Sequence, residues 1–103
     1  MQNLSQQQWQ AQLSQDQEAV IIDVRTPQEI QQGYIPNALH MNIMDAGSFM
    51  AEAQQLDKNK NYFVYCKAGG RSAQACMILN SIGFGNTFNL EGGFDNWQGP
   101  KTV

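Results

Sequence analysis

The order of apolar and polar positions along the chain predicts an alternation of strands and helices. Residues 19–24 and 61–65 are short, mostly apolar runs rich in β-branched and aromatic side chains, and only Asp23 interrupts the first. Such runs are typical of strands buried on both faces, as in a parallel sheet. After the second run the apolar positions lie three and four residues apart, which predicts a helix with one buried stripe. The stripe consists of Ala75, Ile78, Leu79 and Ile82.

Two helix starts carry the same signal, a hydroxyl residue followed three positions later by Gln or Glu. Ser5 and Gln8 predict a helix over residues 6–14, and Thr26 with Glu29 predicts a second, short helix. In such a capping box each side chain hydrogen-bonds the other residue's backbone N–H, so the first turn starts with its free donors satisfied.

Shorter patterns predict the remaining elements. They are an edge strand at 2–4, a strand over 38–43, a helix over 48–56, a last strand over 86–90, a short helix after a glycine turn, and a loose tail at 101–103. Alternating strands and helices indicate an α/β class with a mainly parallel sheet. A chain of 103 residues is expected to form one domain, 1–103.

The junction between the second apolar run and its helix carries the candidate chemistry. The junction reads Cys66, Lys67, Ala68, Gly69, Gly70 and Arg71. A strand that enters a helix through such a loop directs backbone N–H groups and the positive end of the helix dipole at one point. A thiolate placed there is stabilised, so its pKa falls below the free value of about 8.5. We therefore expect Cys66 to be a nucleophile inside a ring of loop amides, at the accessible rim of the sheet.

The other loop residues support this interpretation. Lys67 and Arg71 place two positive charges at the mouth of an otherwise acidic chain, where they would attract an anion and lower the pKa of the thiol. Gly69 and Gly70 would permit the backbone angles and the close approach that the ring requires. We expect the amides of residues 67–71 to point inward.

Composition excludes several function classes. A net charge of −3 gives the chain no attraction to nucleic acid or acidic membranes, and no apolar run is long enough to span a membrane. The Gln-rich stretch 1–17 lacks the pattern of a signal peptide. One histidine and two cysteines without a CxxC pair indicate neither a zinc site nor a disulfide framework, and nothing indicates a cofactor. A reducing cytoplasm is the expected location.

Four further residues admit a structural and a functional interpretation. Cys76 borders the apolar stripe and is expected to fill the core, with a resolving thiol for Cys66 as the alternative. His40 is expected to be structural or exposed rather than catalytic. Arg25 and Glu91 follow strand ends, and we expect them to form an ion pair that braces the loops near the site.

Four segments, in order along the chain, resemble the signatures of the rhodanese-like sulfurtransferase family. They are 22–25 with Pro27 and Glu29, then 33–38, then 66–72, and finally 90–93 with Trp97. Tyr34 and Asn37 replace the histidine and the glycine that are usual in the second segment. The resemblance covers nearly the whole chain and implies a three-layer fold with a mainly parallel, five-stranded sheet flanked by helices.

The resemblance also implies a function. The Cys66 thiolate would take the outer sulfur of thiosulfate, become a persulfide and pass the sulfur to cyanide or to a thiol, such as that of a thioredoxin-like protein. Lys67 and Arg71 would then attract the thiosulfate dianion.

Two alternatives remain open from the residues. One is a persulfide carrier in a sulfur relay. The other is a small cysteine-dependent phosphatase or arsenate reductase, against which the spacing argues. Four residues separate Cys66 from Arg71, one fewer than in the related phosphatase type of loop, so the cradle should be too small for phosphate.

Overall fold

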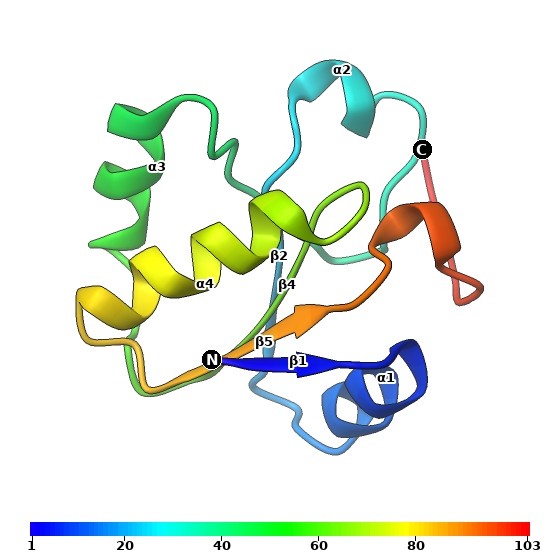
Figure 1. Cartoon of the computed structure of the whole chain (residues 1–103), viewed down its shortest axis with the longest axis horizontal. Helices are drawn as coiled ribbons and strands as arrows, with labels where there is room; N and C mark the ends of the chain where they lie inside the picture. The colour runs from blue at the N-terminus through cyan, green and yellow to red at the C-terminus, as the bar shows by residue number, and fades with distance from the viewer.

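The computed structural model describes residues 1–103, and its strands and helices alternate along most of the chain (Figure 1). The strands are β1 (Gln2–Leu4), β2 (Val20–Asp23), β3 (Leu39–His40), β4 (Asn61–Tyr65) and β5 (Asn86–Leu90). The helices are α1 (Gln6–Ser14), α2 (Pro27–Ile30), α3 (Ala46–Ala53), α4 (Gly70–Ser81) and the 3₁₀ turn η1 (Phe94–Asn96). Both predicted capping boxes form, at the starts of α1 and α2.

The strands form one sheet in the order β1-β5-β4-β2-β3, and every neighbouring pair is parallel. The predicted α/β class with a five-stranded parallel sheet is therefore confirmed. β4 lies at the centre, so the loop that follows it opens at the middle of the carboxyl edge. This edge is where ligands bind in open parallel sheets.

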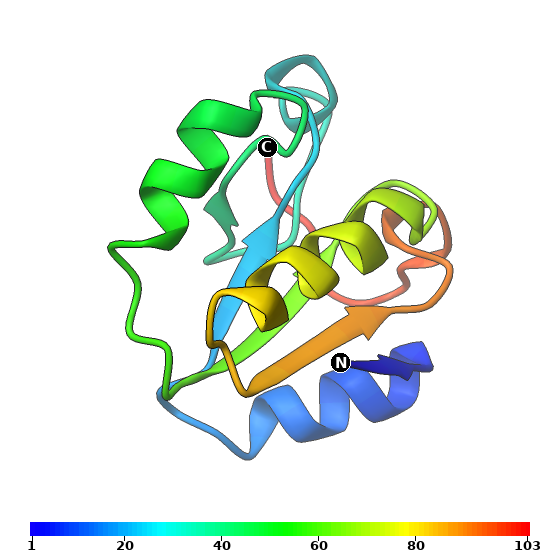
Figure 2. The same cartoon turned by 60° about the vertical axis from the view of Figure 1, so that its left-hand side comes forward.

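Helices cover both faces of the sheet, because alternate side chains of the central strands point to opposite sides. Ile22 and Val64 belong to the core under α3 and α4. Ile21 and Phe63 belong to a second core, which is centred on Trp9 of α1. Figure 2 shows α1 and α4 on opposite sides of the sheet. Three layers result, with the β4–α4 junction held between two packed cores.

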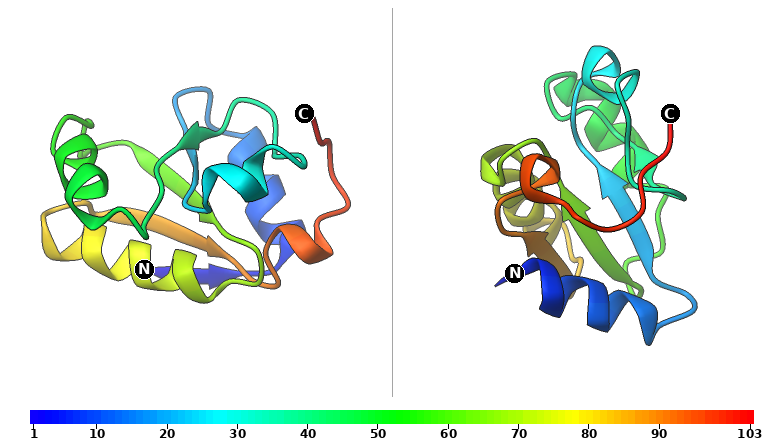
Figure 3. Two further views of the ribbon diagram at one scale, coloured as in Figure 1. Left: turned by 90° about the horizontal axis from the view of Figure 1, so that it is seen from above. Right: turned by 90° about the vertical axis from the view of Figure 1, so that its right-hand side faces the viewer.

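Two expectations about the edges of the fold are wrong. The strand predicted over 38–43 is reduced to the two exposed residues of β3. Ala38 bonds the turn carbonyl of Ile35 before it, and after it β2 itself ends at Asp23, whose carbonyl accepts from Met41. The tail is not loose: Tyr34 and Thr102 exchange two backbone hydrogen bonds of 2.8 and 2.9 Å in an antiparallel bridge. The C-terminal segment thus runs back beside the chain that follows α2 (Figure 3).

A buried ion pair ties the end of β2 to the segment after α2. Arg25 donates to Asp23 through Nε and Nη2 at 2.9 and 2.8 Å, and Nη2 also donates to the carbonyl of Gly33 at 2.8 Å. Tyr65 donates its hydroxyl hydrogen to the same carboxylate at 2.7 Å. The guanidinium lies over the ring of Phe94, 4.4 Å from its centroid. The predicted Arg25–Glu91 pair is therefore wrong, since Arg25 finds its carboxylate two residues away.

None of the helices combines the length and the apolar character needed to cross a membrane.

Candidate active site around Cys66

Cys66 directly follows β4, and the chain then turns through the loop into α4 (Figure 1). Gly69 is the N-cap of α4. Its φ of +109° is a left-handed backbone conformation that residues other than glycine rarely adopt. No side chain caps this helix. Its first amides and the positive end of its dipole are therefore left to interact with whatever lies in the loop.

The sulfur of Cys66 receives hydrogen bonds from the loop. The amide of Gly69 donates to Sγ at 3.0 Å, and the hydroxyl of Ser72 lies 3.3 Å from the same atom. Burial by itself would raise the pKa of Cys66. The hydroxyl of Ser72 and the amides of Ser72, Gly69 and Ala68 outweigh burial and hold this pKa below its ordinary value. The predicted activation of the thiol by its loop is thus supported by geometry.

Only part of the loop bonds Sγ, and the sulfur is better covered than expected. The amides of Lys67, Gly70 and Arg71 make no hydrogen bond with Sγ, so their inward direction stays a prediction for a second sulfur bound to Sγ. Cys66 keeps only 1% of its surface accessible, whereas an open position at the rim was expected. Cys66 belongs to the core under α3 and α4, which covers most of its side chain.

The group that positions Ser72 was not among the predicted site residues. The Ser72 hydroxyl also donates to Oδ1 of Asn89, a buried residue of β5, so its one hydrogen is shared between Oδ1 and Sγ. Asn89 in turn donates through Nδ2 to Oδ1 of Asn3 at 2.9 Å and to the carbonyl of Gly69 at 3.2 Å. One amide therefore connects β1, β5, the loop backbone and the hydroxyl that touches the sulfur. A polar residue in the interior of an otherwise covered strand was the available signal.

The second glycine turn holds the outer side of the loop. The amides of Phe94 and Asp95, at the start of η1, donate to the carbonyls of Cys66 and Lys67 at 2.9 and 3.0 Å. A Cβ on Gly93 would lie 2.5 Å from the Lys67 carbonyl oxygen, so only glycine allows this approach. The loop carbonyls are thereby satisfied on the outside, which leaves loop donors free to face the sulfur.

Both cations of the loop are paired with carboxylates, which corrects the expectation of two free positive charges. Arg71 donates to both carboxylate oxygens of Glu29 at 2.7 and 2.8 Å. Lys67 donates to both oxygens of Asp95 at 3.1 Å. After the hydrogen bond to Glu29 and the opposing effect of burial, the thiolate of Cys66 is still among the charges that raise the pKa of Arg71. Spacing alone could not reveal these partners, because Glu29 lies on α2, 42 residues before Arg71.

The two glycines of the loop have different roles. Gly69 needs its positive φ, as expected. Gly70 has an ordinary helical conformation, and a Cβ there would meet no atom within 4 Å. The expectation that both glycines are required for backbone conformation therefore holds only for Gly69.

The family model described as "Rhodanese-like domain" matches residues 6–100. The chain belongs to the rhodanese-like family. The curated protein "Sulfurtransferase" of Allochromatium vinosum is 38% identical over 85 residues, which are 82% of this chain and 77% of that protein. The "Thiosulfate sulfurtransferase GlpE" of Pseudomonas syringae is 35% identical over 89 residues, which are 86% and 81% of the two chains.

Solved structures agree with this assignment. The crystal structure of a rhodanese-like domain protein from Staphylococcus aureus superposes with a TM-score of 0.81 at 30% identity, over 94% of this chain and 91% of that one. The predicted family is confirmed, and sulfur transfer is the chemistry that it supports.

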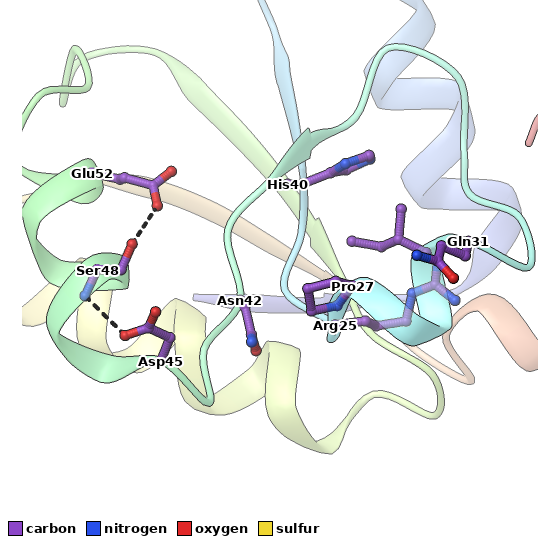
Figure 4. Close-up of a pocket in the computed structure, with 9 residues that line it drawn as sticks. Arg25, Pro27, Gln31, His40, Asn42, Asp45, Ser48 and Glu52 are labelled. Atoms are coloured by element: carbon purple, nitrogen blue, oxygen red, sulfur yellow. Dashed lines mark hydrogen bonds between the residues drawn. The ribbon is translucent and has the colours of Figure 1, made fainter.

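The largest cavity of this rhodanese-like domain lies away from Cys66. It measures about 400 Å³, and its lining includes His40, Asn42, Asp45, Ser48 and Glu52 (Figure 4). His40 packs edge-on against Tyr34 with ring centroids 4.7 Å apart. The histidine therefore lies outside the candidate site, in agreement with the structural role expected for it.

The second cysteine is a core residue. Cys76 is fully buried within the cluster under α4, and burial raises the pKa of its thiol to about 11. A thiol with this pKa is almost entirely protonated near neutral pH and reacts slowly. The structural interpretation of Cys76 is therefore favoured over the resolving thiol.

Proposed function

We propose that this rhodanese-like domain moves a sulfane sulfur from thiosulfate, or from a similar donor, to cyanide or a thiol through a persulfide on Cys66. The observation that carries the proposal is the Gly69 amide, which donates to Sγ, together with the Ser72 hydroxyl, which shares its hydrogen between Sγ and Asn89. They stabilise negative charge on sulfur, which is what both the attacking thiolate and the resulting persulfide require.

The proposed reaction has two displacements. The Cys66 thiolate attacks the outer sulfur of thiosulfate, the S–S bond of the donor breaks, and sulfite leaves with the bonding pair. The acceptor then attacks the terminal sulfur of the persulfide, forms thiocyanate or a new persulfide, and returns the Cys66 thiolate. The donor leaves before the acceptor reacts, so the kinetics are ping-pong.

The loop residues have distinct parts in this proposal. Gly69 and Ala68 contribute amides at the sulfur, Gly70 and Arg71 form the first turn of α4, and Lys67 stands at the mouth. We place the reaction in a reducing cytoplasm, with no nucleic acid, membrane or bound cofactor taking part.

The burial of Cys66 also favours a second function, a persulfide carrier that delivers sulfur to a docked protein. A residue with 1% of its surface accessible would shield a bound sulfur from small acceptors in solution. A thioredoxin-like protein is an acceptor of the required kind.

The experiment is the rate of thiocyanate formation from thiosulfate and cyanide, with Cys66→Ser as the matched variant. The proposal expects turnover by the unaltered protein and none by the variant, whereas equal rates would refute it. Formation of a stable persulfide with poor cyanide turnover would identify the carrier.

A further inference from the structure

The partner of Arg71 is held in place by a second set of contacts. Oε1 of Glu29 accepts hydrogen bonds from the backbone N–H and the hydroxyl of Thr26, both at 3.1 Å, as part of the α2 capping box. The two oxygens of the same carboxylate bind the guanidinium of Arg71. Glu29 cannot swing away without uncapping α2, so the carboxylate is fixed and the arginine is held to it.

The two ion pairs at the loop differ in strength. The side chains of Arg71 and Glu29 are 26% and 25% exposed and form a bidentate pair, the geometry in which guanidinium–carboxylate bonds are strongest. Lys67 and Asp95 are 60% and 48% exposed, and a pair this open is screened by water and easily broken. Arg71 is therefore the more firmly neutralised of the two cations.

Carboxylates also line the space beside the loop. A cavity of about 230 Å³ is bounded by Arg25, Glu29, Gln32, Lys67, Phe94 and Asp95. Arg25 is already neutralised by Asp23, and the other two acids face the cations of the loop. The hydrogen bond from Arg71 is the largest cause that lowers the pKa of Glu29, and it outweighs the opposite effect of burial. The pKa falls to about 2, so Glu29 is charged throughout the physiological range.

We propose that Glu29 is a specificity-determining residue, which neutralises the charge of Arg71 beside the loop and thereby selects against small dianions such as thiosulfate. Donors with one charge or none at the reacting sulfur, such as the persulfide of a thiol, are favoured in its place. This inference rests on the proposed function, because it assumes sulfur transfer at Cys66.

The chemistry of a persulfide donor follows the same displacement. The Cys66 thiolate attacks the terminal sulfur, the donor's S–S bond breaks, and the donor leaves as a thiolate that takes up a proton. No dianion approaches the loop in this reaction. A loop mouth without net positive charge therefore changes the binding of a persulfide donor little. Thiosulfate, in contrast, loses the electrostatic attraction that would raise its local concentration.

The test compares two donors that differ chiefly in charge. Thiosulfate carries two negative charges, and methanethiosulfonate carries the same outer sulfur on a sulfonyl group with one. The quantity measured is the ratio of kcat/KM for thiosulfate to kcat/KM for methanethiosulfonate, at low and high salt. Glu29→Gln keeps an oxygen acceptor for Thr26 and removes the charge. Glu18→Gln makes the same chemical change before β2, at the opposite end of the sheet.

The proposal predicts that Glu29→Gln raises this ratio by about threefold to tenfold at low salt, the effect of one uncovered charge on a dianion in a largely aqueous setting. The increase should shrink as salt is added, and Glu18→Gln should leave the ratio unchanged. Arg71→Gln is the opposite change: it leaves Glu29 unpaired, and the ratio should fall.

A ratio and a salt dependence in Glu29→Gln equal to those of Glu18→Gln would overturn this inference, as would a ratio in Arg71→Gln that does not fall. These outcomes leave the proposed function standing as long as Cys66 still accepts sulfur. If the unaltered protein accepts sulfur from neither donor, the proposed function fails instead.

Discussion

The hydroxyl of Ser72 offers a way to change the charge on the Cys66 sulfur without altering the backbone of the loop. Ser72 is fully buried, and its oxygen lies 3.3 Å from Sγ. A hydrogen bond to an ionised group contributes about 1.5–3 kcal/mol, and sulfur is a weak acceptor, so we take the lower end. With 1.36 kcal/mol per pKa unit, loss of this bond raises the pKa of Cys66 by about one unit.

The variant is Ser72→Ala, and the measurement is the thiolate absorbance near the ultraviolet edge as a function of pH. Subtraction of the Cys66→Ser curve removes the signals of tyrosine and of Cys76. The fraction of thiolate rises with pH through the pKa, so the Ser72→Ala curve should lie about one unit to the right. Ser81→Ala is the matched control, because Ser81 lies at the other end of α4 and bonds only the Ile78 carbonyl.

Ser72→Ala also removes a partner of Asn89, so the variant should lose about 1–3 kcal/mol of unfolding free energy. The loss of stability and the pKa shift are separate readouts. A folded Ser72→Ala protein whose titration curve overlays that of Ser81→Ala would refute the argument that side-chain hydrogen bonding sets the charge of the sulfur.

Three further predictions concern the loop, the brace and the second cysteine. Gly69→Ala should slow persulfide formation, measured by mass spectrometry, at least tenfold, because alanine is strained at φ +109°. Gly70→Ala should leave the rate within about twofold, since a Cβ there meets no atom. Equal rates in the two variants would contradict this assignment. Asp23→Asn should lower the free energy of urea unfolding by about 3–5 kcal/mol, because it leaves Arg25 charged and unpaired in the core. A loss below about 1 kcal/mol would show that the Arg25–Asp23 ion pair is dispensable for stability. Cys76→Ala should keep full sulfur transfer, and a large loss of activity in a folded variant would reinstate a redox role for this thiol.

Local signals in the sequence predicted most of the fold. The helix from Gln6 to Ser14 and the strand from Asn86 to Leu90 lie where the sequence analysis placed them. A capping box and an apolar run are properties of a few neighbouring residues, and the structure preserves them. The tail and β3 were predicted incorrectly because their state depends on contacts with distant backbone, such as the bridge between Tyr34 and Thr102.

The candidate site divides in the same way. Cys66 and Gly69 could be predicted because a strand, a glycine and a helix in succession determine their geometry. The partner of Arg71 could not, because Glu29 of α2 reaches Arg71 only when the chain is folded. Arg25 instead pairs with Asp23, two residues away, although its predicted partner was Glu91. Ser72 directly follows the loop and could have been named from its hydroxyl, whereas Asn89 becomes relevant only when β5 lies beside β4.

The central claim is that Cys66, held by the donors of its own loop, carries the transferred sulfur. The most direct test is the mass of the intact protein and of its peptides after treatment with thiosulfate or methanethiosulfonate and removal of the donor. The account predicts a gain of one sulfur atom, located on the peptide that contains Cys66, absent from Cys66→Ser and lost again when cyanide is added. A sulfur found on Cys76, or an unchanged mass with both donors, would contradict it.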